Sequence, residues 1–462
     1  MSNYKFSLDP ILVEKVKTKN RKIKTAIPTP GTKKILNEIF KRESRSMHGQ
    51  LPIIWNKAID YNVYDINGNK WIDFTSTIFV TNVGHSNLRV NKAIKETLDN
   101  SLYSSYAYLN LKRNEYLKKL INFVGPPFEK AFLLSAGTEA TEACLKLMRM
   151  HGQKIKKKKL GIVCFEGNWH GRTLGAQMMS SNEAQKKWIE DRDPEIHFLK
   201  FPYPWDLKGQ SSESFLNSEI LNLEKKGIDI KNDLCGFMLE TFQGWGAVFY
   251  PVNFVKEIRR ICDENNILLA FDEMQAGFGR TGKKFGFMHY DISPDLIACG
   301  KGMGGGTPLS GVIGKKHVLD LPETGNMSST HSANPLVCAA GLAVIEELEE
   351  KNLIFEARLK GQIFFSALKN LQKKFPDLIS YVEGKGMIWA LIFNKSNKQY
   401  DVSVLCSKVA EICMQKGLLV VHTGRESIKL GPPLTIPEDA LIEGVNIIEE
   451  SIRTVLNQNA KL

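Results

Sequence analysis

From about residue 86 to residue 300, short apolar runs alternate with stretches that have the spacing of amphipathic helices. The stretch "FVKEIRRICDENN", for example, is helical in pattern and lies between two apolar runs. Alternation of this kind predicts βαβ units and a mostly parallel sheet, that is, an α/β fold. The runs predicted as strands are "AFLL" (131–134), "GIVCF" (161–165), "CGFMLE" (235–240), "ILLAFDE" (267–273) and "DLIAC" (295–299).

The segments on either side of this rhythm have a different pattern. Residues 50–85 alternate apolar and polar positions around "DINGN", which indicates a hairpin. A long helix is predicted from about Pro335, strands at "GMIWALIF" and "GLLVV", and a last helix near Pro437. We therefore expect a basic N-terminal arm (1–50), an N-terminal segment joining the small domain (51–85), a large domain (86–340) and a C-terminal small α+β domain (341–462).

The composition is that of a globular protein with a sizeable core and not of a membrane protein. At 462 residues the chain has the length of two domains, and 43% of its residues are hydrophobic. No apolar run reaches the roughly 20 residues of a membrane span, and the first residues do not resemble a secretory signal. The eight cysteines are scattered singly, without a C-x-x-C pair. This usage favours a reduced, cytoplasmic protein without a structural metal site.

The net charge of +12 is concentrated near the N-terminus, where residues 1–50 hold twelve Lys or Arg against four Asp or Glu. A basic arm can bind nucleic acid or an acidic membrane. No aromatic residues interleave with its charges, however, and no nucleic-acid motif follows. We expect a solvated, partly ordered extension, with neither nucleic acid nor membrane as a partner.

The stretch "DLIACGKGMGGGTPLSG" (295–311) contains the spacing G-x-G-x-x-G after an apolar strand. A dinucleotide site needs a helix that begins at the last glycine, because the pyrophosphate binds at its N-terminus. Here the last glycine, Gly305, stands within a run of three glycines that a threonine and a proline follow, and such a sequence does not open a helix. The glycines are instead expected to let backbone approach Lys301 closely.

Three other stretches carry polar groups directly after predicted strands. Asp272 ends an apolar run, where an unpaired carboxylate is costly, although a salt bridge or cap would also account for it. Gly137 and Thr138 begin a helix after a strand and so offer an anion site, or an ordinary cap. Trp169 and Arg172 lie on a glycine-bounded loop, where a packed ring and a surface cation are the plain alternative. Together with Lys301, these groups match what pyridoxal 5'-phosphate requires.

With these motifs, in this order and spacing, the sequence resembles the class III (omega-amino) aminotransferases of fold type I from about residue 50 to residue 455. The resemblance implies a large cofactor domain with a mostly parallel sheet flanked by helices, a smaller α+β domain, and pyridoxal phosphate as cofactor. Lys301 would hold the cofactor as a Schiff base and shuttle a proton, and Asp272 would pair with the pyridine nitrogen. The cofactor-binding residues that it implies are Gly137, Thr138, Trp169, Asp272, Met274, Gln275, Lys301 and Thr330.

The resemblance also implies a homodimer, because Thr330 matches a threonine that reaches the phosphate of the neighbouring subunit. The implied substrate-binding residues are Ile78, Arg172, Glu240 and Lys429. Lys429 stands where the family has an arginine, which predicts looser recognition of an α-carboxylate. Ser76, Thr77 and Phe79 stand where many members have glycine, and Phe79 either narrows the pocket or packs beneath it.

The predicted function is transfer of an amino group from an amine or (omega-)amino acid to a 2-oxo acid by a ping-pong mechanism. Within the same fold the alternatives are an amino-acid racemase or epimerase, an aminomutase and a phospho-lyase. Two other classes are a nucleotide-binding oxidoreductase, which the missing helix after Gly305 disfavours, and a non-catalytic scaffold. The retention of Lys301, Asp272 and Gln275 gives no reason to favour a scaffold.

Overall fold

A computed structural model describes residues 4–397 and 399–459 of the chain. The first three residues of the expected arm and the last three of the expected C-terminal domain lie outside the described residues, as does residue 398. The chain separates into two compact units. We call residues 88–244 and 248–355 the central unit, and residues 4–87, 245–247 and 356–459 the terminal unit. Among the described residues, none of the helices has the length and apolar character that crossing a bilayer requires.

The central unit is built on a seven-stranded sheet in the order β6-β14-β13-β12-β9-β7-β8. β14 runs antiparallel to both of its neighbours, whereas the pairs from β13 to β8 are parallel. The apolar runs are buried on both faces, as parallel strands require, so the α/β expectation is confirmed. The strands are β6 (Lys130–Leu134), β7 (Gly161–Phe165), β8 (Ile196–Leu199), β9 (Leu234–Glu240), β12 (Leu268–Asp272), β13 (Leu296–Cys299) and β14 (Ser310–Gly314).

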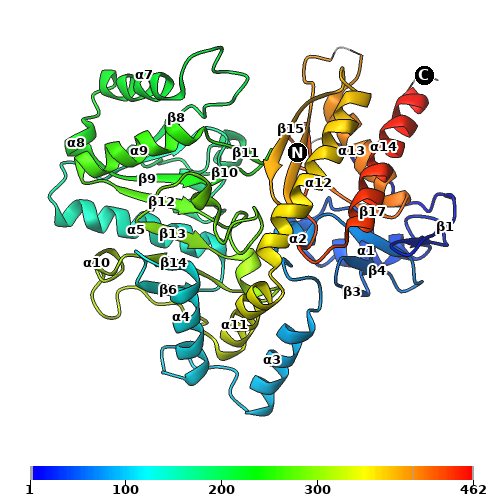
Figure 1. Cartoon of the computed structure of the whole chain (residues 1–462), viewed down its shortest axis with the longest axis horizontal. Coiled ribbons are helices and arrows are strands. Elements are labelled where there is room, and N and C mark those ends of the chain that lie inside the picture. The colour runs from blue at the N-terminus through cyan, green and yellow to red at the C-terminus, as the bar shows by residue number, and fades with distance from the viewer. Residues whose placement is uncertain (1–3, 398, 460–462) are drawn as a thin grey trace. The chain divides into compact units, whose positions relative to one another are not determined.

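Helices cover this sheet, and Figure 1 shows α5 and α9 on its two sides. α5 begins cleanly because the Glu139 carboxylate accepts hydrogen bonds from the backbone N–H groups of Ser135 and Ala136, each at 2.9 Å. α9 ends at Asn266, whose left-handed φ of 51° stops the helix. The helices that follow the strands are α5 (Gly137–Lys154), α6 (Leu174–Met179), α7 (Ser212–Lys225), α8 (Ile230–Asp233), α9 (Val252–Asn265) and α10 (Lys316–Leu319).

Three further helices of the central unit pack together: α3 (Leu88–Asp99), α4 (Leu111–Val124) and α11 (Pro335–Glu350). α11 has proline at its start and Asn334 as its cap, whose side chain accepts from the Leu336 N–H at 2.9 Å. A short hairpin, β10 (Phe242–Gln243) with β11 (Val248–Phe249), follows β9. The helix predicted from Pro335 is therefore confirmed.

The terminal unit contains two sheets. The first has the order β1-β2-β5-β4-β3, with β17 added at β5, and the second has the order β15-β16-β19-β18. The strands are β1 (Val16–Lys17), β2 (Lys22–Ile23), β3 (Lys57–Ile59), β4 (Asn62–Tyr64), β5 (Lys70–Asp73), β15 (Ile379–Lys385), β16 (Ile388–Phe393), β17 (Leu418–Leu419), β18 (Val421–His422) and β19 (Ser427–Leu430). The helices are α1 (Thr32–Phe40), α2 (Ser76–Phe79), α12 (Leu353–Lys374), which crosses the boundary between the units, α13 (Val402–Gln415) and α14 (Glu438–Asn459).

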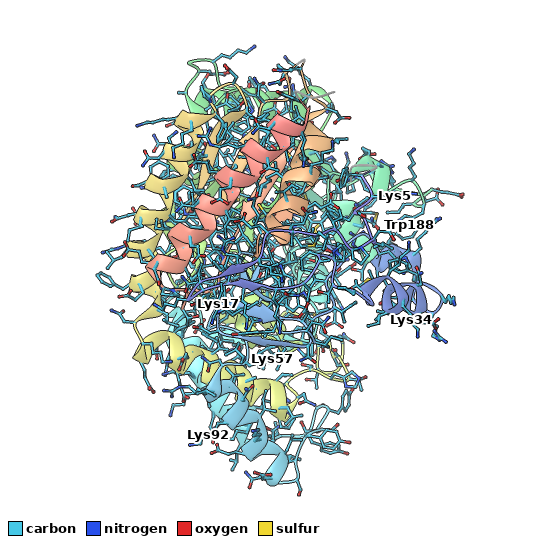
Figure 2. All side chains as sticks on the ribbon, turned by 90° about the vertical axis from the view of Figure 1, so that its right-hand side faces the viewer. Lys5, Lys17, Lys34, Lys57, Lys92 and Trp188 are labelled. Carbon is cyan, nitrogen blue, oxygen red and sulfur yellow. The ribbon has the colours of Figure 1, made fainter. Side chains whose placement is uncertain are left out.

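The basic N-terminal segment is partly packed into the first sheet, through β1 and β2, whereas residues 33–50 are mostly exposed. Ile23 and Ile27 are fully buried, and Arg21 pairs with Glu443 of α14 at 2.8 Å. Two of its exposed lysines, Lys17 and Lys34, lie well apart on this unit (Figure 2). The expected arm is therefore only partly a solvated extension, since acidic residues of α14, which are distant in sequence, pair with part of its basic charge.

Candidate functional site

A cavity of about 220 Å³ lies in the central unit, next to the carboxyl ends of β9, β12 and β13. Open parallel sheets bind ligands at this edge, because the loops that leave the strands meet there. Its walls are Gly137, Thr138, Trp169, His170, Gly171, Glu240, Thr241, Phe242, Asp272, Met274, Gln275, Ala276 and Lys301. Eight of the residues that the sequence singled out are therefore brought together in one cavity.

Lys301 begins a short 3₁₀ turn (Lys301–Gly304) directly after β13. Its φ of 46° is left-handed, a conformation that non-glycine residues adopt rarely and that occurs often at functional sites. Burial lowers the pKa of its ammonium below the ordinary 10.5, while the carboxylates of Asp272 and Glu240 act in the opposite direction. Its amine is therefore more readily neutral, and so nucleophilic, than that of an exposed lysine.

The glycine before Lys301 is explained by the Met274 thioether. A Cβ atom added at Gly300 would lie 2.7 Å from Met274 Sδ, and one added at Gly137 would lie 2.9 Å from it. Both distances are too short for a carbon–sulfur contact, so neither position accepts a side chain without movement of Met274. The prediction that glycine allows close approach near Lys301 holds for Gly300, although the neighbour that requires it is a side chain.

Asp272, at the end of β12, is buried, and each of its carboxylate oxygens has a hydrogen-bond partner. Its Oδ1 accepts from the Met274 N–H at 3.0 Å, and its Oδ2 lies 2.9 Å from His170 Nδ1. The other ring nitrogen of His170, Nε2, lies 2.7 Å from Asn168 Nδ2. Asn168, His170 and Asp272 thus form a continuous buried chain of hydrogen bonds.

Glu273 follows Asp272 and points away from the cavity into the core. Its carboxyl accepts from the Thr241 hydroxyl, from the Gly286 N–H at 2.7 Å and from the Phe287 N–H at 2.6 Å. Complete burial raises its pKa to about 7, which these hydrogen bonds only partly oppose. Glu273 therefore anchors the segment that follows Asp272 at the end of β12.

The N-terminus of α5 faces the cavity with Gly137 and Thr138. The first N–H groups of a helix have no intrahelical acceptor, and the helix dipole favours an anion there. The Thr138 hydroxyl lies 2.6 Å from the Thr173 hydroxyl. A Cβ atom at Gly171 would come within 2.3 Å of Thr138 Oγ1, so this corner requires glycine. The arrangement suits a phosphate group.

Trp169 and Arg172 lie on the same loop, which follows β7. The backbone N–H of Trp169 donates to Glu240 Oε2 at 3.1 Å. The Arg172 guanidinium lies 4.7 Å from the centre of the Trp169 ring. Gln275 and Glu240 approach each other near Gly244, where an added Cβ would be 2.7 Å from Gln275 Nε2 and 2.5 Å from Glu240 Oε1. Arg172 is exposed and does not line the cavity.

Three predicted site residues lie elsewhere. Thr330 is exposed in a turn of the central unit. Ile78 and Lys429 belong to the terminal unit, where Lys429 is 2% exposed with its Nζ 4.5 Å from the centre of the Phe79 ring. Phe79 is buried, with its ring against the Lys429 amine.

Ile78 lies in the left-handed turn of α2 and is 45% exposed. Four consecutive residues, Ser76 to Phe79, have φ values of 47°, 53°, 62° and 69°. Ile78 and Thr77 line a second cavity, of about 460 Å³, within the terminal unit, together with Leu51, Ile53 and Trp55. The terminal unit thus has an apolar cavity of its own beside a strained turn.

Sequence reasoning missed His170, Gly171 and the Thr241–Phe242 wall of the cavity. His170 was detectable in principle, since it adjoins Trp169 and the chain has only nine histidines. Its partner Asp272 is 102 positions away, however, and no local sequence pattern predicts that contact. Among the described residues, we find no group of three or more His, Cys, Asp or Glu side chains arranged to hold a metal ion.

The residues of the cavity fit pyridoxal phosphate, the cofactor expected from the sequence. A desolvated amine suits an aldehyde, a buried carboxylate suits a pyridine nitrogen, and a helix N-terminus suits a phosphate. The glycines leave room where the backbone must pass close to other groups. The candidate holders are Lys301, Asp272, Gly137, Thr138, Trp169, Met274 and Gln275.

Comparisons with known proteins agree with this geometry. The family model described as "Aminotransferase class-III" matches residues 44–452. An acetylornithine aminotransferase of Caldanaerobacter subterraneus subsp. tengcongensis is 29% identical over 90% of this chain and 98% of its own. An alanine/serine racemase of Pyrococcus horikoshii is 29% identical over 98% of this chain and 96% of its own. The crystal structure of a Bacillus anthracis aminotransferase superposes with a TM-score of 0.83 at 23% identity, over 92% of this chain and 98% of that one, a likeness of fold alone.

Proposed function

This chain belongs to the class-III aminotransferase family, whose model spans residues 44–452, and we propose that Lys301 is the residue through which it transfers amino groups. The observation that carries this proposal is the buried Lys301 amine, with its lowered pKa, in one cavity with Asp272. The central unit would be the cofactor-binding domain, and the terminal unit would combine the N-terminal segment with the small C-terminal domain.

Pyridoxal phosphate is the cofactor, and when bound it supplies an electrophilic carbon and an electron-accepting ring. The neutral Lys301 amine would bond to the cofactor as a Schiff base and, when displaced by substrate, carry the proton that is lost and regained. Asp272 would hold the proton on the pyridine nitrogen, and Trp169 and Met274 would clamp the ring. Gly137 and Thr138 would bind the phosphate.

For the substrates, we propose an amine or (omega-)amino acid as donor and a 2-oxo acid as acceptor, used in a ping-pong cycle. Arg172 would bind a carboxylate, because a guanidinium forms bidentate hydrogen bonds with it. Glu240, Ile78 and Lys429 would contribute to the same recognition. The apolar cavity beside Ile78 supports a role for that residue in holding the carbon chain of a substrate.

We further propose a homodimer in which Thr330 reaches the phosphate of the neighbouring subunit. Support comes from the loop before α4, whose large apolar and aromatic side chains are exposed, with Tyr108 at 80% and Leu109 at 89%. Soluble proteins rarely expose such a cluster unless a partner covers it. A cytoplasmic location is part of the same proposal, supported by eight buried cysteines, none of them in a disulfide.

A second candidate is a racemase or epimerase, favoured by the match to the Pyrococcus enzyme over nearly the whole chain. Both reactions use the same lysine and acid and differ in where the proton returns. An aminomutase or phospho-lyase would use them too, but no particular observation favours either.

The half-reaction with a single amine separates these functions. Purified holoenzyme is mixed with one donor and no acceptor, and the visible absorption of the bound cofactor is followed. A transaminase converts the cofactor stoichiometrically to its amine form and stalls until pyruvate or 2-oxoglutarate is added. Lasting absorption of the aldehyde form together with inversion of an L-amino acid would make the enzyme a racemase. A panel of donors in the same assay identifies the substrate.

A further inference from the structure

We propose that Asn168 is a positioning residue for Asp272, acting through His170. Its amide NH₂ fixes the His170 imidazole as the neutral tautomer with the proton on Nδ1, and that proton holds Asp272 as an oriented carboxylate. The consequence for catalysis rests on the proposed function, but the tautomer itself is a property of the protein alone.

Hydrogen-bonding chemistry gives the direction of each link. Asn168 Nδ2 lies 2.7 Å from His170 Nε2, and an amide NH₂ is a donor only, so Nε2 must accept. A neutral imidazole that accepts at Nε2 carries its proton on Nδ1. That nitrogen lies 2.9 Å from Asp272 Oδ2 and donates to it.

The opposite tautomer would remove this support. Its Nδ1 lone pair would face the Asp272 oxygen, and two acceptors at 2.9 Å repel unless the carboxyl takes up a proton. A protonated Asp272 could not keep a pyridine nitrogen protonated. Whether His170 Nε2 is protonated therefore decides whether Asp272 is a carboxylate that suits its proposed role.

The chain of side chains is held rigidly. The backbone N–H of His170 donates to Ser180 Oγ at 2.8 Å, and its backbone carbonyl accepts from Thr141 Oγ1 at 2.8 Å. The His170 side chain is completely buried, and Asn168 is 2% exposed. Water therefore does not compete for either ring nitrogen, and the neighbouring amide sets the tautomer.

Asn168 makes this contact at a cost. Its Oδ1 is buried and has no hydrogen-bond partner among the residues that the structure describes. A buried acceptor without a partner costs about 1–3 kcal/mol, so a purely structural asparagine would be poorly placed here. The amide is better explained by the donor that it presents to His170.

The test measures the tautomer directly. Protein labelled with ¹⁵N-histidine is examined by NMR, with and without pyridoxal phosphate, and the His170 signals are assigned by comparison with His170→Gln. We expect an unprotonated Nε2 and a protonated Nδ1 in both forms. Protonated Nε2 in the wild-type protein would overturn the proposal without any other variant.

Two substitutions extend the test to function. Asn168→Leu removes the donor, and Asn168→Asp replaces it with an acceptor that draws a proton onto Nε2. For both we expect a changed His170 signature and a kcat about 10- to 100-fold lower, with KM little altered, as for other groups that orient a reacting side chain. Asn168→Asp keeps the size of the side chain, so the test survives if the leucine variant does not fold.

Asn62→Leu is the matched control, since Asn62 is also buried and its Nδ2 donates at 2.9 Å to two carbonyls in the terminal unit. It should lower stability and leave the His170 signals unchanged. If the Asn168 variants lose no more kcat than this control, the positioning role is wrong. A wild-type protein with the expected tautomer but without transaminase activity would contradict the proposed function alone.

Discussion

The cavity around Lys301 and the turn at Ser76–Phe79 differ in whether glycine stands where the local geometry favours it. Beside Lys301, the backbone passes close to Met274, and glycine stands at both positions where a Cβ would collide. At Ser76–Phe79 four residues in succession have left-handed φ values, and none is glycine. For an L-residue this conformation costs roughly 1–2 kcal/mol.

The difference indicates which of the two regions has the more strained backbone. The chemistry of a shared cofactor leaves little freedom, so the cavity of the central unit keeps the expected residues. In the terminal unit the chain retains bulky side chains on a strained backbone, beside an apolar cavity lined by Ile78 and Trp55. Strain of this kind persists where surrounding packing enforces it, often at functional sites. We therefore expect substitutions in the turn to change donor preference, and substitutions in the cavity to lower kcat.

The largest effect is expected from Lys301→Ala. Loss of the amine removes both the covalent anchor and the proton carrier, and kcat should fall by about 10⁴-fold or more. Steady-state assays with the best donor measure this loss. Lys284→Ala, in the same unit, is the control and should retain most activity. Comparable turnover in the two variants would place the chemistry elsewhere.

Asp272→Asn should follow, with kcat reduced by about 10²- to 10⁴-fold and cofactor affinity reduced less. The Asp272 charge also raises the pKa of Lys301, against the stronger effect of burial. Without that charge, uptake of pyridoxal phosphate by the apoprotein should reach its half-maximal rate at a lower pH. Glu240→Gln should shift this pH in the same direction. An upward shift would contradict the assigned electrostatics.

The buried Glu273 carboxyl, next to Asp272 in the chain, should make the free energy of unfolding depend on pH. Burial raises the pKa of its carboxyl from 4.5 to about 7, so the folded state binds more protons than the unfolded state between these values. Its contribution to the free energy of unfolding should fall as pH rises from 4.5 to 7, by about 3 kcal/mol at most, and stay constant above. Urea unfolding of the wild type and of Glu273→Gln across this range measures the difference. If the difference in free energy of unfolding between the two proteins did not change with pH, the pKa of the Glu273 carboxyl would not be raised in the folded state.

Arg172→Ala tests recognition outside the cavity. If the guanidinium binds a carboxylate, kcat/KM should fall about 10- to 100-fold for carboxylated donors and little for simple amines, since a charged hydrogen bond contributes about 1.5–3 kcal/mol. Equal losses for both donor types would mean that Arg172 supports Trp169 through the contact between their side chains.

The smallest effect is expected from Thr77→Gly in the left-handed turn. Glycine relieves the backbone, and after its own entropic cost the free energy of unfolding should rise by up to about 1 kcal/mol. Thr454→Gly in helix α14 should instead lower it by about 0.3–0.5 kcal/mol. Urea midpoints compare the two variants, and a loss of stability in both would show that the turn is unstrained. A change in donor preference in Thr77→Gly would link the strain to recognition.

The strands of the central unit were predictable because each is a short apolar run bounded by polar turns. Lys301, Asp272 and Trp169 follow different strands of one sheet, and the strand ends bring them to the same cavity. This part of the site needs only local pattern and the topology of a parallel sheet.

The rest depends on contacts between distant parts of the sequence. Arg21 meets Glu443 across 422 positions, and no local pattern reveals that this pair draws the basic segment onto the fold. The left-handed turn is equally hidden, because β-branched Thr77 and Ile78 have no preference for such a conformation. His170 was overlooked because its importance lies in which oxygen it faces.

Reduction of the holoenzyme with borohydride tests the central claim most directly. The treatment should fix the cofactor to the protein as a stable secondary amine, and peptide mapping should find the added mass on the peptide that contains Lys301. We expect one labelled site per chain, absent from Lys301→Ala. Stoichiometric labelling of a different lysine, or an unmodified Lys301 in active enzyme, would contradict the account.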